Sequence, residues 1–435
     1  MSLAISKLEI TDLNIRNAKK MGIVQLTASD QQLNGRQVTI DGRKKLNFGS
    51  CSYLGLEIDE RLKQAAIEAI LKYGVQFSSS RAYISLGIYE ELEGLLGQIF
   101  GHPTLVSPST SSGHLSIIPV LVGPKDLVIL DHQVHASVQT AVLQVKAKGV
   151  AVEMIRHNNM EYLESRLVEL QGEYDKIWYM ADGIYSMYGD GAPLLELQRL
   201  LNSYDNFHLY IDDAHGMSWM GKHGSGYVLS QIDLHPKMYL ITSLNKSYAT
   251  AGGAMVFPNR ESYDLVRNCG GTLMFSGPVP IPSLGAAVAS ARIHLSDEIY
   301  TLQDELHQKI KYFIEQSRKL DLPLIKDELT PIFFMGVGKS ELSQKICQRL
   351  LRDGLYINTA FFPSVPYNRA GLRMTITRHN QLEDIDLLLE SIAMHLDAEL
   401  EQSDFSRKDI YRNFKMKRET RDSKVPKVRR QTASS

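Results

Sequence analysis

The feature that most constrains the fold is a series of short apolar runs that alternate with helical patterns between about residues 100 and 260. Most of these runs are apolar at consecutive positions, as strands must be when helices cover both of their faces. Strands and helices that alternate in this way predict a mostly parallel α/β sheet sandwiched by helices. The runs are 127–130, 150–155, 177–180, 209–211 and 239–241.

Polar side chains follow four of these runs, at the points where the strands should end. They are Asp131, Asp182, Asp212 and Ser243. In open α/β sheets, ligands bind outside the carboxyl ends of the strands. The alternation of strand and helix therefore already predicts a ligand site at this edge of the sheet.

The pattern changes near residue 290, where a long helical stretch (297–320) opens a second, shorter α/β series. We expect an N-terminal arm (1–45), a large domain (46–290), a smaller C-terminal α/β domain (291–400) and a basic tail (401–435). The tail holds eleven Lys or Arg against five Asp or Glu. Such a composition predicts disorder in at least its last fifteen or so residues, with a solvated tail favoured over contact with an acidic partner.

Charge and composition exclude several classes of function. The chain has 48 basic and 49 acidic residues, so no overall positive field attracts nucleic acid. No apolar run is long enough for a membrane span, and the N-terminus lacks a signal-peptide pattern. Cys51, Cys269 and Cys347 are far apart, and His132 and His135 lack further ligands at metal-binding spacing. We expect a cytoplasmic protein without a metal site.

A run of hydroxyl side chains and glycine precedes one of the helical stretches. It reads Ser109-Thr110-Ser111-Ser112-Gly113-His114. Free N–H groups at a helix N-terminus, together with hydroxyls, form a cup for an anion, and the helix dipole favours phosphate. Taken alone, the run is explained more often as an ordinary Ser-rich helix cap.

Two further strand ends carry groups suited to cofactor chemistry. Strand alternation places Asp212 and Asp213 on opposite faces, so only one of them can address a ligand. Lys246 follows the run 239–241, where partial desolvation lowers the pKa of an amine and makes it nucleophilic. A phosphate cup, an aspartate and a lysine at strand ends are together the components of a pyridoxal phosphate (PLP) site.

Six ordered motifs make the chain resemble the α-oxoamine synthases, a family of fold-type I PLP-dependent transferases, from about Leu46 to Leu389. In the family's own patterns they are N-F-x-S-N-x-Y-L-G-L at 47–56, D-x-x-x-H-A-S at 131–137, E-G-x-F-S-M followed by G-D-x-A-P-L at 182–194, D-[DE]-A-H at 212–215, T-x-x-K at 243–246 and R-[IL]-R-x-T at 371–375.

The resemblance implies roles for individual residues. Lys246 forms the Schiff base, Asp212 meets the pyridine nitrogen, His135 stacks on the ring, and His215 contacts the phenolic oxygen. The catalytic set is thus Lys246, His135, Asp212 and His215. The other implied cofactor contacts are Ser112, Gly113, His114, Ser186, Ser243 and Ser276, and the implied substrate contacts are Arg373, Arg81 and Ser80.

The implied activity is a PLP-dependent decarboxylative condensation of glycine, alanine or serine with an acyl thioester. The acyl donor is acyl-CoA or an acyl-carrier protein, and the products are an α-aminoketone, CO2 and a free thiol. The resemblance also implies a homodimer with the active site at its interface. An aminotransferase of the same fold is the alternative; a catalytically inactive partner subunit is disfavoured because Lys246 is present.

The chain departs from the family pattern at several positions. Cys51 replaces an asparagine, Tyr89 a histidine, Tyr188 an aspartate and Gly371 the first arginine of R-[IL]-R, and Ser276-Gly277 lacks one hydroxyl of a Ser-Thr pair. Most of these positions belong to the expected thioester site and subunit interface. They predict the same chemistry with an unusual acyl donor.

Overall fold

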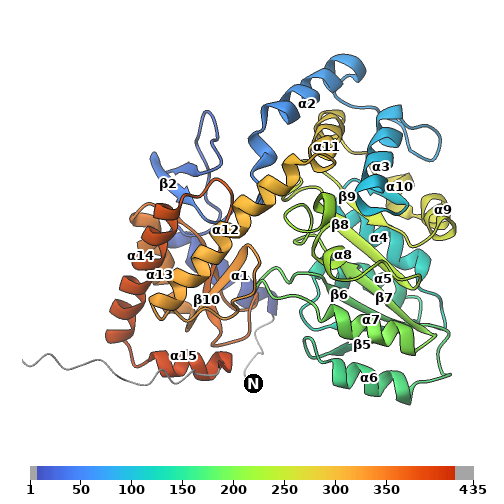
Figure 1. Cartoon of the computed structure of the whole chain (residues 1–435). Helices are drawn as coiled ribbons and strands as arrows, with labels where there is room; N and C mark the ends of the chain where they lie inside the picture. Colours follow the sequence, from blue (N-terminus) through green and yellow to red (C-terminus); the bar gives the residue numbers. More distant parts are fainter. Residues whose placement is uncertain (1–6, 417–435) are drawn as a thin grey trace, which may run out of the picture.

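The computed structural model describes residues 7–416, which form two lobes connected by the long helix α12 (Glu298–Lys319) (Figure 1). The larger lobe is built on a seven-stranded sheet of order β3-β9-β8-β7-β6-β4-β5, in which only β9 runs antiparallel to its neighbours. Its strands are β3 (Thr104–Ser107), β4 (Leu127–Asp131), β5 (Ala151–Ile155), β6 (Ile177–Asp182), β7 (Phe207–Asp212), β8 (Met238–Ser243) and β9 (Gly253–Val256).

Helices cover both faces of this sheet, as the apolar strands require, because neither face can be left in water. The strand side chains alternate between two apolar cores, one on each face. One core is closed by α3 (Gly87–Phe100), α6 (Met160–Glu169), α7 (Leu194–Ser203), α8 (Tyr227–Gln231) and α11 (Ile281–His294). The other is closed by α4 (Thr110–Leu121), α5 (Ala136–Lys146), α9 (Arg260–Cys269) and α10 (Gly271–Phe275). The predicted fold class is confirmed.

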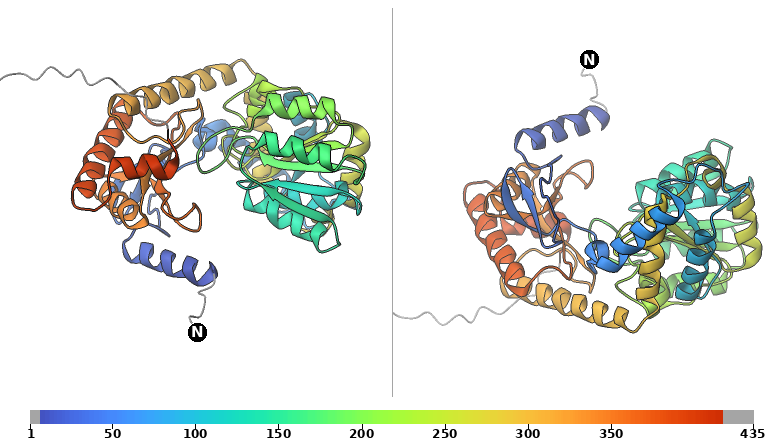
Figure 2. Two further views of the ribbon diagram at one scale, coloured as in Figure 1. Left: turned by 90° about the horizontal axis from the view of Figure 1, so that it is seen from below. Right: turned by 90° about the horizontal axis from the view of Figure 1, so that it is seen from above.

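The smaller lobe has an antiparallel sheet of order β10-β13-β12 beside three helices. Its elements are β10 (Ile332–Gly338), β12 (Asn358–Ala360), β13 (Ala370–Thr375), α12, α13 (Ser340–Arg352) and α14 (Leu382–Glu401). The two lobes lie side by side in all three ribbon views (Figure 2). Helix α2 (Glu60–Tyr73) packs chiefly on α11 of the large lobe, and the 3-10 turn η1 (Leu56–Ile58) precedes it. A second 3-10 turn, η2 (Lys222–Gly224), contacts α3 and α12.

The N-terminal arm is part of the smaller lobe. Within the arm, β1 (Gln37–Ile40) and β2 (Arg43–Asn47) form a hairpin, and β2 pairs in parallel with β11 (Leu355–Tyr356). Helix α1 (Lys7–Lys20) packs there too: the Asn14 side-chain amide donates to the Phe362 carbonyl at 2.8 Å. The arm is therefore anchored to the C-terminal half of the chain.

The predicted disordered tail requires a correction over its first part. Helix α15 (Arg407–Phe414) begins at a capping box between Ser406 and Asp409, and it buries Ile410 in the core of the smaller lobe. The buried Ile410, the half-buried Phe414 and the cap together stabilise this helix, although its charge-rich sequence did not predict it. Residues 417–435, which carry the rest of this prediction, lie outside the described part of the chain. Within the described part, no helix combines the length and apolarity needed to span a bilayer.

Candidate active site

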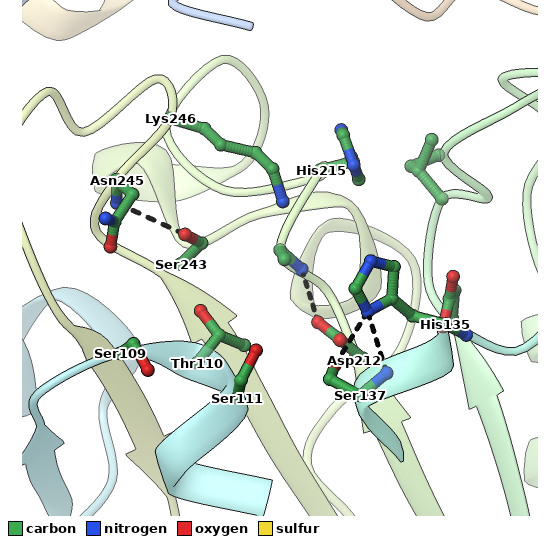
Figure 3. A pocket seen from close by; sticks show the side chains of 13 residues that line it. Ser109, Thr110, Ser111, His135, Ser137, Asp212, His215, Ser243, Asn245 and Lys246 are labelled. Carbon is green, nitrogen blue, oxygen red and sulfur yellow. Dashed lines mark hydrogen bonds between the residues drawn. The ribbon is translucent and has the colours of Figure 1, made fainter. Parts of the chain in front are cut away.

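A pocket of about 230 Å³ opens at the carboxyl edge of the large sheet, where the sequence predicts a ligand site. Five of the predicted residues line it: Lys246, Asp212, His135, His215 and Ser243. They come from the ends of β7 and β8 and from the start of α5, and their side chains face one common space (Figure 3). The parallel sheet thus brings together residues separated by more than a hundred positions.

The N-terminus of α4 forms one wall of the pocket. Ser109 caps the helix: its hydroxyl accepts from the Ser112 N–H at 3.1 Å, while the Ser112 hydroxyl accepts from the Ser109 N–H at 2.9 Å. Thr110 and Ser111 face the pocket beside Ser109, and N–H groups of a first helical turn lack intrahelical partners. This wall can bind an anion, with Ser112 acting through the cap instead of lining the pocket.

Gly113 explains how α4 lies so close to the sheet. A Cβ atom at this position would lie 2.5 Å from Ile241 Cδ1 and 2.9 Å from Ser107 Oγ. Only glycine therefore lets the first turn of α4 approach the end of β8, next to Ser243. Gly113 thus supports the anion-binding wall but does not line the pocket.

Asp212 lies at the floor of the pocket and is held by a buried chain of hydrogen bonds. Its Oδ2 is 3.0 Å from His114 Nε2, and its Oδ1 accepts from the Ala214 N–H at 3.0 Å. His114 Nδ1 in turn is 2.7 Å from the Tyr210 hydroxyl. Burial opposes the charged form of Asp212, but His114, Lys246 and His135 outweigh it, so that the pKa of Asp212 is lowered. His114, predicted as a cofactor contact, lies behind Asp212 and orients it.

This chain also fixes the proton positions. A carboxylate only accepts, so His114 must carry its hydrogen on Nε2 toward Asp212. Burial raises the pKa of Tyr210 well above its ordinary value, so its hydroxyl keeps its proton beside His114 Nδ1. Asp212 thus accepts one hydrogen bond from the His114 ring and one from the Ala214 N–H while it lines the pocket.

Lys246 extends into the pocket from the loop after β8 (Figure 3). Burial lowers its pKa below the ordinary value, and the nearby Asp212 offsets part of this effect. No hydrogen bond joins its amino group to the other side chains drawn in the pocket. A desolvated amine without a fixed partner has the properties required of a nucleophile or a base.

His135 and Asp182 meet on the wall opposite α4. The His135 N–H donates to Asp182 Oδ1 at 3.0 Å, and His135 Nδ1 lies 2.6 Å from the Ser137 hydroxyl. Burial lowers the pKa of His135, and burial and Asp212 raise that of Asp182 well above its ordinary value. Both shifts favour the neutral form of the side chain beside Asp212. Sequence reasoning placed Asp182 at the sheet edge but gave it no role.

His215 binds a residue of the first motif. Its Nδ1 lies 2.8 Å from the hydroxyl of Tyr53, and both side chains are buried. Burial, Lys246 and Arg373 all lower the pKa of His215, which is therefore neutral. Tyr53 is a site residue that sequence reasoning missed, although it is the tyrosine of the N-F-x-S-N-x-Y pattern.

Arg373 reaches the site from β13 of the smaller lobe. Its Nε donates to the Ser186 carbonyl at 2.7 Å, and its Nη2 lies 3.8 Å from Cys51 Sγ. It does not line the pocket itself, but its charge lowers the pKa of Lys246 and of His215. Ser186, predicted as a cofactor contact, therefore acts here through its carbonyl on Arg373.

Gly371 replaces the first arginine of the family pattern, at a position that has no room for a side chain. A Cβ atom on Gly371 would lie 2.3 Å from Phe334 Cε1 and 2.4 Å from the Met335 carbonyl oxygen. Phe334, on the neighbouring strand β10, occupies the volume that a side chain at 371 would need.

Three further predicted residues neither line the pocket nor support a residue that lines it. The Arg81 guanidinium bonds Glu93 and the Val106 carbonyl, both at 2.9 Å, and stacks on the Tyr89 ring, so its contacts do not support substrate binding. The Ser80 hydroxyl donates to a backbone carbonyl at 2.7 Å, and Ser276 is exposed. The roles of Ser80 and Ser276 stay predictions.

The donor set fits PLP. The N-terminus of α4 with Ser243 suits the phosphate, the charged Asp212 suits a protonated ring nitrogen, and the buried Lys246 amine suits an aldehyde carbon. In residues 7–416, no group of three His, Cys, Asp or Glu side chains is placed to hold a metal ion.

Comparison with known proteins gives the same chemistry. The family described as aminotransferase class I and II matches residues 43–392. The chain is 32% identical to the 8-amino-7-oxononanoate synthase of Symbiobacterium thermophilum over 395 residues, which cover 90% of this chain and 98% of that protein. It is 30% identical to the serine palmitoyltransferase (SPT) of Sphingobacterium spiritivorum over 393 residues, which cover 89% and 96%. A solved structure of SPT with its PLP internal aldimine matches at a TM-score of 0.81 and 25% identity, covering 90% and 98%.

Proposed function

The chain belongs to the class I and II aminotransferase family and, within it, to the PLP-dependent acyltransferases of the α-oxoamine synthase type; on this premise we propose that it condenses glycine, alanine or serine with an acyl thioester. The products are an α-aminoketone, CO2 and a free thiol. The observation that carries the proposal is the pocket that unites Lys246, Asp212 and His135 beside Arg373.

The predicted residues of the pocket have separate proposed tasks toward the cofactor. The N-terminus of α4 and Ser243 hold the phosphate, Asp212 the ring nitrogen, His215 the phenolic oxygen and Lys246 the aldehyde carbon. His135 supplies an aromatic face for the ring. When bound, PLP supplies an electron sink for negative charge that develops at the substrate's α-carbon.

The amino acid is bound by one basic side chain and deprotonated by another. The Arg373 guanidinium binds the substrate carboxylate through paired hydrogen bonds. The lowered pKa of Lys246 leaves its amine able to accept the α-proton. The neutral Asp182 and His135 avoid additional charges that would compete with Asp212 for the cofactor ring.

The acyl donor is a thioester of CoA or of an acyl-carrier protein. Cys51, Tyr188 and Gly371, which depart from the family pattern, all belong to the surroundings of Arg373 and the adjoining loop. They support an unusual acyl chain or carrier. Transamination is not favoured, because the relatives described above are acyl-condensing enzymes.

We infer an isologous homodimer with the active site at its interface. The loops that carry Ser80 and Ser276 are linked by the bond from Ser80 to the Met274 carbonyl, and they lie at the surface. Large apolar side chains are exposed in the same loops, with Tyr83 at 90% and Phe275 at 87% exposure. A second copy that covers this surface would bring Ser276 to its neighbour's phosphate site.

The experiment is product analysis by mass spectrometry. PLP-loaded protein is incubated with glycine, alanine and serine and with acyl-CoAs and acyl-carrier thioesters of varied length. We expect an α-aminoketone and release of thiol, and a K246A variant that is at least ~1000-fold slower because the nucleophile and base are lost.

The matched control is K237A. Lys237 lies before the other end of β8, where its amino group donates to the Tyr204 carbonyl at 2.6 Å, and its loss should leave turnover unchanged. Conversion of an added oxo acid to an amino acid, without release of thiol, would instead establish transamination.

A further inference from the structure

A buried ionic network lies beside the pocket and has no part in the chemistry described so far. His157, just after β5, is bound on both sides by carboxylates: its Nδ1 lies 3.0 Å from Asp131 Oδ1, and its Nε2 lies 2.9 Å from Asp190 Oδ2. The side chain of Asp131 is fully buried, and that of Asp190 is 2% exposed. The His157 ring also receives the edge of the Tyr185 ring at 4.3 Å.

The geometry requires that His157 carry a positive charge. Each ring nitrogen faces a carboxylate oxygen, and carboxylates only accept, so both nitrogens must bear hydrogen. Burial opposes this charge, but the two carboxylates outweigh it and raise the pKa of His157 to about 9. An imidazolium with two buried anions is a strong connection between the segments that carry them.

The two carboxylates belong to segments that place different parts of the active site. Asp131 ends β4, and its Oδ1 accepts from the Gln133 N–H at 2.7 Å, at the start of the turn that leads to His135. Asp190 belongs to the loop 185–191, whose Ser186 carbonyl holds Arg373. The loop is closed on itself, because the Tyr185 N–H donates to the Asp190 carbonyl at 2.9 Å.

The smaller lobe holds the same loop from its other side. Lys326 Nζ lies 3.6 Å from Asp190 Oδ2, the Gly191 N–H donates to Glu328 at 2.9 Å, and Thr330 donates to the Gly189 carbonyl at 2.8 Å. Asp190 therefore has two cationic partners, Lys326 and His157. Lys326 is half exposed, so the contact with the more buried His157 is the one that is better shielded from water. The loop therefore joins both lobes, and His157 fixes it to the sheet.

We propose that His157 is a positioning residue for the amino acid substrate: in its charged form it holds the loop 185–191 in place and, through the Ser186 carbonyl, keeps Arg373 aimed at the substrate carboxylate. This inference rests on the proposed function, because it assigns the carboxylate to Arg373. His157 itself touches neither the pocket nor the reacting atoms. Loss of its charge weakens amino acid binding and leaves cofactor binding intact.

The test is the amino acid dissociation constant of PLP-loaded H157Q, measured from the absorbance change on titration without any acyl donor. Glutamine keeps hydrogen-bond donors but not the charge. We expect a Kd about 10-fold weaker than wild type at pH 7.5, unchanged PLP affinity, and faster amide hydrogen exchange in 185–191. H208N is the matched control: His208 is half-buried at the opposite end of β7, bonded to the Asn206 carbonyl at 3.1 Å.

The pH dependence separates positioning from a purely structural role. The ratio of the two dissociation constants, H157Q over wild type, cancels the titration of the substrate's own amine. It should fall toward one above pH 9, where wild-type His157 loses its proton. The groups that face His157 are Asp131, Asp190, Lys326 (through Asp190), Tyr185 and, through Asp131, Tyr179.

A second variant covers the case in which H157Q does not fold. D190N leaves His157 paired with Asp131 and should weaken amino acid binding by a smaller factor in the same direction. A wild-type Kd in both variants, or a Kd ratio that stays constant from pH 7 to 10, overturns the inference. Failure of the proposed function looks different: amino acid binding is then normal in wild type, but no thioester is consumed.

Discussion

At the scale of single residues, the site works by separating one charged carboxylate from its neutral neighbours. Asp182 and Asp212 end adjacent strands and lie opposite each other in the register of β6 and β7. The bond from His114 lowers the pKa of Asp212 and favours its charged form, whereas burial and the charge of Asp212 raise the pKa of Asp182 and favour its protonated form. Two carboxyl groups in one pocket thus take different forms because their hydrogen-bond partners differ.

The hydrogen-bond chain behind Asp212 gives the first prediction. H114F keeps a ring of similar shape but removes the donor to Asp212, and a hydrogen bond to a charged group contributes roughly 1.5–3 kcal/mol. We expect kcat/KM to fall about 10- to 100-fold, since each 1.4 kcal/mol corresponds to a factor of ten. The fall in kcat/KM is measured by steady-state kinetics of thiol release.

Y210F is the graded control for this prediction, because it removes only the outer bond of the chain, to His114. Its loss should be a few-fold. Equal losses in H114F and Y210F would show that orientation of the imidazole, and not the bond to Asp212, is what matters.

The sequence predicted the ends of the strands well and the second layer of contacts poorly. Lys246, Asp212 and His135 follow from apolar runs and motifs, and the structure brings them into one pocket. Tyr53 could not be assigned, because its bond to His215 joins residues 162 positions apart in different lobes. Such a contact depends on how the lobes pack, which no local pattern encodes.

At the scale of elements, the short helix α15 connects the end of the described chain to the active site. Phe414 packs on Phe334 with ring centroids 6.1 Å apart, and Phe334 packs on Tyr188 at 4.8 Å. Tyr188 belongs to the loop that holds Arg373 through Ser186. The charged sequence of α15 hid this element. Strands β3 and β9 were missed because β3 has only two apolar residues between Thr104 and Ser107 and β9 begins with a glycine.

F414A tests this connection. Loss of a half-buried phenylalanine should lower the free energy of unfolding by about 2 kcal/mol, below the range of fully buried sites. The KM for the amino acid should rise a few-fold, because Phe334 and Tyr188 lose support. Urea denaturation and amino acid titration measure the two effects.

R412A is the control on the same helix. Within residues 7–416, Arg412 forms one ion pair, with Asp409 at the surface, where such pairs contribute little, so its effect should stay within about 0.5 kcal/mol. If F414A unfolds more readily but keeps a wild-type KM, α15 stabilises the lobe without reaching the site.

At the scale of the whole molecule, the surface over α2 and the adjoining loops is where we propose that the second subunit binds. Ile67 and Leu71, one turn apart on α2, are 50% and 81% exposed, and Val75 beyond the helix is 70% exposed. Apolar side chains gathered in this way mark an interface. Ser276 and Ser80 lie in loops that would be covered by the same partner.

L71D should therefore convert a dimer into monomers and weaken PLP binding at the same time, because Ser276 no longer reaches the other subunit. Sedimentation velocity and a PLP titration measure the two changes. L195D is the control: Leu195 is 71% exposed on α7, away from α2, and its substitution should leave both properties unchanged. A monomeric wild type with full PLP affinity would contradict the proposed interface.

The contact between Gly371 and Phe334 restricts the order in which this sequence can change. A larger residue at 371 collides with the ring of Phe334 and with a strand carbonyl, and the ring is itself wedged between Tyr188 and Phe414. An arginine at 371 therefore needs both a smaller side chain at 334 and a shift of strand β10 away from β13. A single substitution at 371 is not enough to introduce it.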